Sequence, residues 1–152
     1  MVPERIEREV LIEAPLDVVW AVVTEPQHVG GWFGDSAEID LRPGGEAVLT
    51  WEKHGSALAV VEKVEPPHTF SFRWARPLGA APGEGNSTLV EFSLSAEGES
   101  TRLRVVESGF PALDGSEDEK ATYAEENTQG WKHELGDLQE YVAELVRASA
   151  RR

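Results

Sequence analysis

The chain has 152 residues, and its 28 acidic and 14 basic side chains give a formal net charge of −14 at pH 7. A surface this negative repels nucleic acid and anionic membranes, so neither is expected as a partner. The chain contains no cysteine, which excludes disulfides, thiolate catalysis and cysteine-bound metal.

The length suits a single domain spanning residues 1–152. The opening residues MVPERIEREV are charged and lack the apolar core of a signal peptide. No apolar run approaches the roughly 18–20 residues that a membrane span needs. We therefore expect a cytoplasmic protein, and the sequence leaves monomer and homodimer open.

The start of the chain predicts a strand followed by two short helices. Residues 5–13 alternate between apolar and charged side chains, which is typical of a half-buried strand. Pro15 favours a helix start, because its missing N–H costs nothing in the first turn, and apolar residues follow at helical spacing. Residues 28–34 then form a short helical turn and loop that carries Trp32 and Phe33.

The middle of the chain predicts an antiparallel sheet. From residue 38 to 108 the pattern has a period of two and is interrupted regularly by turn residues. Consecutive strands joined by short turns pair in an antiparallel way. A loop rich in Pro, Gly and Ala occupies residues 76–85. The predicted strands are residues 37–41, 46–52, 56–64, 68–74, 87–95 and 101–108.

The last part of the chain predicts one long amphipathic helix over residues 117–149. Ser116 with Glu119 fits a capping box at its start. Burying the five large side chains of its apolar stripe is worth about 8–15 kcal/mol gross, so the sheet must supply a surface that receives them. The stripe consists of Trp131, Leu135, Leu138, Val142 and Leu145.

This order of elements predicts an α+β fold. A curved antiparallel sheet of about six to seven strands would wrap around the long C-terminal helix, with two short helices after the first strand. A sheet that is wider than the helix leaves a gap between them, and that gap is the natural ligand site.

A series of short motifs runs through nearly the whole chain. They are Ile12-Glu13-Ala14-Pro15 with Val19-Trp20, Trp32-Phe33-Gly34, Arg42-Pro43-Gly44-Gly45, Val64-Glu65-Pro66-Pro67 with Phe72 and Trp74, Glu107-Ser108-Gly109-Phe110, and Gly130-Trp131. Their order and spacing resemble the SRPBCC superfamily, also called START-like or helix-grip. The closer resemblance is to the domain family named for the activator of heat-shock protein 90 ATPase. It implies the helix-grip fold with a hydrophobic cavity between sheet and long helix.

The resemblance implies no single activity, because relatives bind lipids and hormones, cyclise polyketides or have no known role. Three functions stay open. The preferred one is binding of an apolar small molecule in the cavity. The alternatives are an enzyme of the polyketide cyclase or hydrolase kind that uses a cavity carboxylate, and a co-chaperone-like interaction module. The co-chaperones of the family carry a separate N-terminal domain for their chaperone partner, for which this chain has no room, so no chaperone partner is expected.

No motif predicts a cofactor, a metal site or a catalytic nucleophile. His133-Glu134 begins like the metalloprotease motif HExxH, but residue 137 is Asp, which indicates a surface pair on the helix. No serine lies in GxSxG, and Gly83-Glu84-Gly85 is acidic where a phosphate loop needs Lys. The remaining histidines lack the spacing of metal ligands; they are His28, His54 and His68.

Aromatic residues on loops or element ends beside glycine predict the mouth of the cavity. For these aromatics, the alternative interpretation is an ordinary hydrophobic core. The predicted ligand-binding set is Trp32, Phe33, Trp51, Phe72, Trp74, Glu107, Phe110, Trp131 and Leu135.

Glu107 is the sharpest of these predictions. By strand alternation it shares a face with Leu103 and Val105, so it points toward the interior near the end of its strand. A carboxylate there is costly unless it is paired, hydrated or protonated. We expect it to orient a donor group of the ligand or to act as a general acid or base, with Trp131 as an opposing wall. The alternative is that a bulge or the strand's end turns Glu107 toward solvent.

Overall fold

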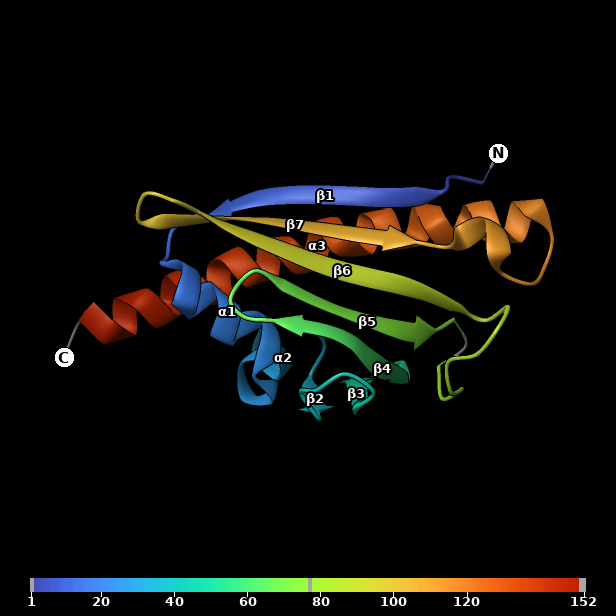
Figure 1. Ribbon diagram of the computed structural model, residues 1–152, viewed down its shortest axis with the longest axis horizontal. Coiled ribbons are helices and arrows are strands. Elements are labelled where there is room, and N and C mark those ends of the chain that lie inside the picture. The colour runs from blue at the N-terminus through green and yellow to red at the C-terminus, as the bar shows by residue number, and fades with distance from the viewer. Residues whose placement is uncertain (1, 77, 151–152) are drawn as a thin grey trace.

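The computed structural model describes residues 2–76 and 78–150, which form one antiparallel sheet, three helices and a 3-10 turn (Figure 1). In chain order the elements are β1 (Arg5–Ile12), α1 (Leu16–Thr24), α2 (Pro26–Trp32), β2 (Ser36–Ile39), β3 (Glu46–Trp51), β4 (Gly55–Glu65), β5 (Thr69–Ala75), β6 (Ser87–Glu97), β7 (Ser100–Ser108), the 3-10 turn η1 (Phe110–Ala112) and α3 (Glu117–Ala150).

The sheet has seven strands in the order β1-β7-β6-β5-β4-β3-β2. From β2 to β7 each strand pairs with the next one along the chain, as short turns require. The exception is β1, which pairs with the last strand in a register that sets Arg5 opposite Ser108. The predicted α+β helix-grip fold, with its antiparallel sheet and two short early helices, is confirmed.

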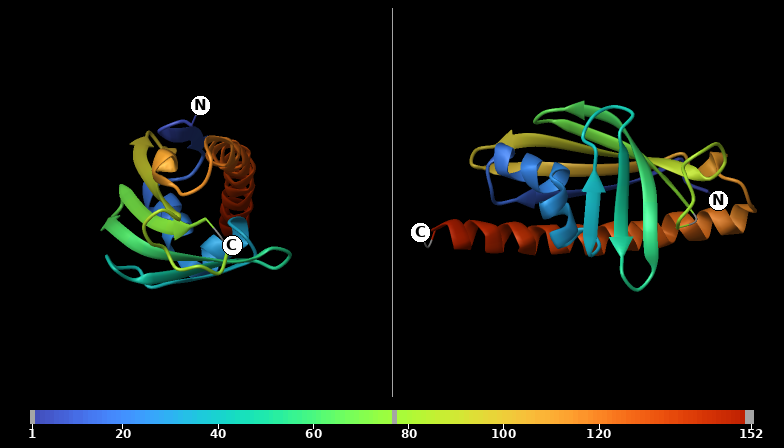
Figure 2. Two further views of the ribbon diagram at one scale, coloured as in Figure 1. Left: turned by 90° about the vertical axis from the view of Figure 1, so that its right-hand side faces the viewer. Right: turned by 90° about the horizontal axis from the view of Figure 1, so that it is seen from below.

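The long helix α3 lies along the concave side of the curved sheet. Seen along its length (left-hand view of Figure 2), the sheet curls around the interior, and α3 runs nearly the full length of the molecule in the right-hand view. The helix buries the predicted stripe, because Trp131, Leu135, Leu138 and Val142 are all buried and Leu145 packs partly against them. Hydrophobic burial on one stripe therefore fixes which face of α3 meets the sheet.

The ends of the helices follow from local chemistry. The predicted capping box is present: the Ser116 hydroxyl accepts from the Glu119 N–H at 3.1 Å, and the Ser116 N–H donates to Glu119 Oε1 at 3.1 Å. Pro26 is the first residue of α2, so this helix begins two residues earlier than the pattern predicts. Pro15 lies one position before α1, with an extended backbone, rather than inside its first turn.

Two apolar clusters hold the layers together. The larger one fills the space between the sheet, α1, α2 and α3 and includes Phe70, Phe72 and Phe92. A small second cluster joins η1 to the start of α3 through Phe110, Leu113 and Ala124. None of the helices within residues 2–76 and 78–150 combines the length and apolarity needed to cross a membrane.

Candidate functional site

The carboxylate of Glu107 lies at the centre of a hydrogen-bond cluster between the sheet and α3. The side chain is 0% exposed and points inward from β7, as strand alternation predicts. Oε1 accepts from Trp131 Nε1 at 2.9 Å and from Asn127 Nδ2 at 3.0 Å. Oε2 accepts from Trp74 Nε1 at 3.0 Å, Thr88 Oγ1 at 2.5 Å and Asn127 Nδ2 at 2.9 Å.

These donors explain how a carboxylate is buried at acceptable cost. Both oxygens receive hydrogen bonds, and a carboxylate offers about four acceptor positions in total, so its hydrogen-bonding capacity is filled. The donors come from β5, β6 and α3, which means that one side chain of β7 ties the helix to three adjacent strands. Glu107 thereby fixes the orientation of two indole rings and one amide.

The side chains that Glu107 holds line an open groove beside α3. Two adjoining pockets of about 310 Å³ and about 220 Å³ share Trp51, Trp74 and Asn127, and we call the combined surface the aromatic groove. The larger pocket adds His54, Ala57, Ala75, Arg76, Leu78 and Tyr123, and the smaller one adds Phe33, Gly130, Trp131 and Glu134. Glu107 lies behind this wall and presents no surface to it.

The wall of the groove is a continuous set of packed aromatic rings. Trp131 stacks on Trp74 with 5.7 Å between ring centroids and on Phe33 with 5.3 Å. Trp51 meets Phe33 edge-on at 5.3 Å. Trp51 and Trp74 remain partly exposed, so part of the surface of two indole rings is accessible to a flat ring from solution.

The interior beneath the groove is almost completely filled. The space against Phe70, Phe72 and Phe92 has only about 10 Å³ of free volume, about the minimum for one water molecule. Trp32 closes this space, and its indole N–H donates to the Val22 carbonyl at 2.9 Å. The free space next to the aromatic cluster is therefore the open groove rather than a deep hollow.

Glu134 places a titratable carboxyl at one end of the groove. Burial raises its pKa to about 7, and the nearby Asp137 and Asp35 also raise it. The Trp51 indole and His133 act in the opposite direction, but less strongly than burial. A carboxyl with a pKa near neutrality can both donate and accept a proton at physiological pH.

Arg76 and Tyr123 form the other end of the groove. The guanidinium carbon of Arg76 lies 5.1 Å from the centre of the Tyr123 ring, which is a cation–π contact. The pKa of Tyr123 is raised by burial and by the negative charge of Glu107, so its hydroxyl stays neutral. The groove therefore has a cation at one end and a proton-exchanging carboxyl at the other.

Comparison with known proteins assigns the family. The sequence matches the family described as Activator of Hsp90 ATPase homolog 1-like protein over residues 13–143. The chain belongs to this family. The predicted SRPBCC and Hsp90-activator resemblance is thus confirmed. No curated protein matches the chain.

Several solved structures have a similar fold. DynU16, a protein of the dynemicin biosynthetic locus, is 26% identical with a TM-score of 0.75 and covers 93% of this chain, which spans about half (48%) of DynU16. CalU16 from Micromonospora echinospora is 26% identical with a TM-score of 0.68, over 97% of this chain and 82% of its own. The Aha1 dimer from Colwellia psychrerythraea is 18% identical with a TM-score of 0.72. The match covers 90% of this chain and 93% of the Aha1 chain.

Apart from Glu107, which is buried behind the groove, the residues predicted for the site divide into three groups. Phe33, Trp51, Trp74 and Trp131 meet at the aromatic groove. Trp32 and Phe72 line the small interior space, and Leu135 is buried in the core on the same face of α3. Phe110 lies apart from the groove, in the small cluster at the start of α3.

Nine residues that line the groove were missing from the predicted set, among them Asn127, Glu134, Arg76 and Tyr123. Asn127 and Glu134 come four residues before and three after Trp131, so helical spacing alone could have placed them on its face. Tyr123 lies four residues before Asn127, so the same helical spacing could have placed it there. Arg76 carries no such signal, because it follows β5 and meets Tyr123 only through the tertiary fold.

His133 lies on the surface of α3. His133 Nε2 lies 3.3 Å from Asp137 on the exposed face of α3, and the described part of the chain holds no group of three or more potential metal ligands.

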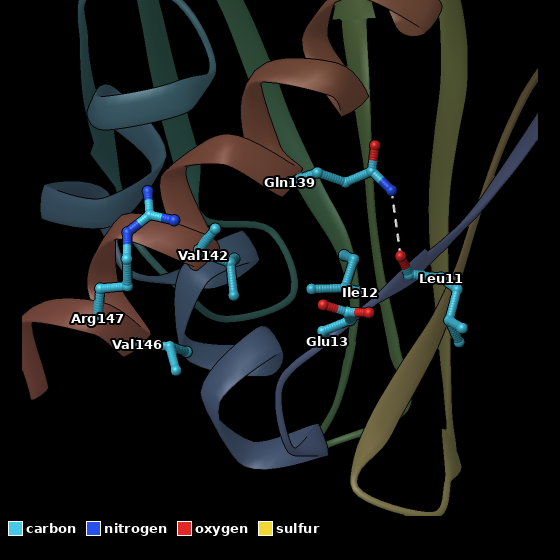
Figure 3. Close-up of a pocket in the computed structure, with 8 residues that line it drawn as sticks. Leu11, Ile12, Glu13, Gln139, Val142, Val146 and Arg147 are labelled. Carbon is cyan, nitrogen blue, oxygen red and sulfur yellow. Dashed lines mark hydrogen bonds between the residues drawn. The ribbon is translucent and has the colours of Figure 1, made fainter. Parts of the chain in front are cut away.

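A pocket of about 400 Å³ lies between the end of β1 and the C-terminal half of α3 (Figure 3). There Gln139 Nε2 donates to the Leu11 carbonyl at 3.1 Å. The α3 residues that line this pocket come after those that line the aromatic groove.

Proposed function

We propose that this protein binds an apolar, ring-shaped small molecule in the aromatic groove. The observation that carries the proposal is the packed wall of Phe33, Trp51, Trp74 and Trp131, two members of which keep part of their surface exposed. Flat rings stack on such a wall by dispersion and quadrupole interactions, in addition to the gain from removing apolar surface from water.

The size and polarity of the groove support a small ligand. Its two pockets of about 310 Å³ and about 220 Å³ adjoin each other, which suits a molecule of a few fused rings. Asn127 and Glu134 supply polar groups along an otherwise apolar surface, and a few such groups are what orients a ligand. The likeness to DynU16, which comes from a biosynthetic locus, also supports a small-molecule role.

One observation favours an enzyme as the second candidate. Burial raises the pKa of Glu134 to about 7 at the edge of the groove, where it could serve as a general acid or base. A cyclase or hydrolase of this kind would use Glu134 rather than Glu107, whose oxygens are already occupied. Conversion of a bound ligand by the wild type and not by Glu134→Gln would support this candidate.

Binding of the neutral naphthalene dye prodan tests the proposed function. We expect its emission to shift to the blue with the wild type, and Trp51→Ala to weaken binding about 2- to 12-fold, which is what one aromatic contact is worth. Trp20→Ala is the matched control, because it truncates another half-buried tryptophan outside the groove. Weaker binding by Trp20→Ala with unchanged binding by Trp51→Ala would place the dye elsewhere and contradict the proposal.

A further inference from the structure

We propose that the ligand of the aromatic groove is a flat aromatic acid whose anionic group pairs with Arg76. The inference rests on the proposed function and names the chemical class of the ligand. It is carried by the position of one guanidinium, which lines the larger pocket together with Trp51 and Trp74.

The fold holds Arg76 in place at the groove. It directly follows β5, and its backbone N–H donates to the Asn86 carbonyl at 2.6 Å, so its backbone continues the sheet. Its guanidinium stacks over Tyr123, with 5.1 Å between the guanidinium carbon and the ring centre. Stacking covers one face of the planar group and leaves its N–H edges available to an oxyanion.

Arg76 forms no ion pair with a carboxylate in the part of the chain that the structure describes. Most arginines of this acidic protein form ion pairs with carboxylates; these are Arg5, Arg42, Arg73, Arg102, Arg104 and Arg147. Among the carboxylates of residues 2–76 and 78–150, none forms a salt bridge with Arg76.

Glu119, on which the charge of Arg76 acts, and Glu107, which like Arg76 acts on Tyr123, already have partners. The pKa of Glu119 is lowered mainly by hydrogen bonds from Ser116 in the capping box, and Arg76 contributes least. The carboxylate of Glu107 is enclosed by its own donors, and Tyr123 keeps a neutral hydroxyl beside the guanidinium. An anion from solution is therefore the missing partner of Arg76.

Local charge decides whether an acid can enter. The net charge of −14 repels anions at long range, but salt screens this repulsion beyond about 8 Å at physiological ionic strength. A half-buried guanidinium in contact with the anion acts within that distance and in a lower dielectric than bulk water. At the other end of the groove, Glu134 carries only part of its negative charge near pH 7, because burial raises its pKa to about 7.

Calorimetric titration with naphthoate and its neutral isostere naphthamide tests the inference. A hydrogen-bonded charge pair predicts that the wild type binds naphthoate about 10- to 100-fold more tightly than naphthamide. Arg76→Gln should remove this preference by weakening the binding of naphthoate far more than that of naphthamide. Arg73→Gln is the matched control: Arg73 lies on β5, the strand that Arg76 directly follows, but pairs with Glu62, so this variant should keep the preference.

Arg76→Lys is the second variant, because it keeps the charge and loses the planar fork. We expect it to retain a reduced preference for naphthoate, which would support the inference even if Arg76→Gln failed to fold. Equal binding of both compounds by the wild type, or an unchanged preference in either Arg76 variant, would overturn the inference and leave the proposed function standing. If the wild type bound neither compound nor prodan, the proposed function itself would fail.

Discussion

At the scale of single residues, Glu107 shows how a buried charge can be structural. Its two oxygens accept from Trp74, Thr88, Asn127 and Trp131, whose polar groups would otherwise need other partners in a dry interior. A donor left unsatisfied there costs about 1–3 kcal/mol. The carboxylate therefore stabilises the protein mainly by satisfying the groups around it.

Glu107→Gln tests this role, because it keeps the size of the side chain and replaces one acceptor oxygen with an NH₂ donor. The new donor would face indole or amide N–H groups. We therefore expect the free energy of unfolding, measured in urea, to be lower than that of the wild type by at least about 2 kcal/mol. Glu62→Gln, which alters an exposed carboxylate, should change stability by less than about 0.5 kcal/mol. Near-identical urea midpoints for all three proteins would show that the Glu107 cluster contributes little.

Glu134 predicts a pH dependence of stability. Burial raises its pKa from 4.5 to about 7 in the folded protein, so the folded state binds this proton more tightly than the unfolded state does. Its contribution to stability is complete below about pH 4.5 and is lost as the pH rises through about 7. Asp35, Asp137 and His133 interact with it electrostatically. The contribution of Glu134 alone is therefore found by comparing the wild type with a variant that lacks this carboxyl.

We expect Glu134→Gln to lose less thermal stability than the wild type as the pH rises from about 5 to about 8. Glu140→Gln, an exposed carboxylate on the same helix, should keep the wild-type slope. Melting temperatures followed by circular dichroism over this range give the comparison. Parallel slopes for the wild type and Glu134→Gln would mean that the Glu134 carboxyl titrates at its ordinary pKa.

At the scale of elements, α3 is held by two different interactions. Its apolar stripe packs on the sheet, whereas Asn127 and Trp131 bind the carboxylate of β7. The spacing of apolar residues was enough to predict the stripe, because the residues that recur at helical spacing are the ones that are buried. The hydrogen bonds to Glu107 could be predicted only in part. Strand alternation predicts that Glu107 points inward, but it does not predict which donors surround the carboxylate.

Leu138→Ala tests the apolar part of this anchoring. Leu138 is 0% exposed and lies in the main core, so its truncation should lower the free energy of unfolding by about 2–5 kcal/mol. Val146→Ala is the control on the same helix, because Val146 is 41% exposed, and it should cost less than about 0.5 kcal/mol. A loss below about 1 kcal/mol for Leu138→Ala would show that the helix is not held by its stripe.

At the scale of the whole molecule, local sequence patterns were enough to predict the fold. Alternation, turn residues and one long stripe specify strands, hairpins and the gripping helix, and each of these signals lies within about 35 residues. The site depends on side chains brought together from β3, β5 and α3, such as Trp51, Trp74 and Trp131. Glycine-flanked aromatics indicated part of it, but the contact of Arg76 with Tyr123 depends on how the loop after β5 meets α3.

The pairing of β1 with β7 has a consequence for how the chain folds during synthesis. β1 is synthesised before the other six strands, yet it pairs with the last of them. Arg5 can pair with Ser108 only after β7 has been synthesised. Until then its backbone N–H and C=O groups form an open edge, which is the kind of surface that neighbouring nascent chains can join. The alternating charges of β1, such as Glu7 and Glu9, face solvent on that edge and oppose such association between identical chains.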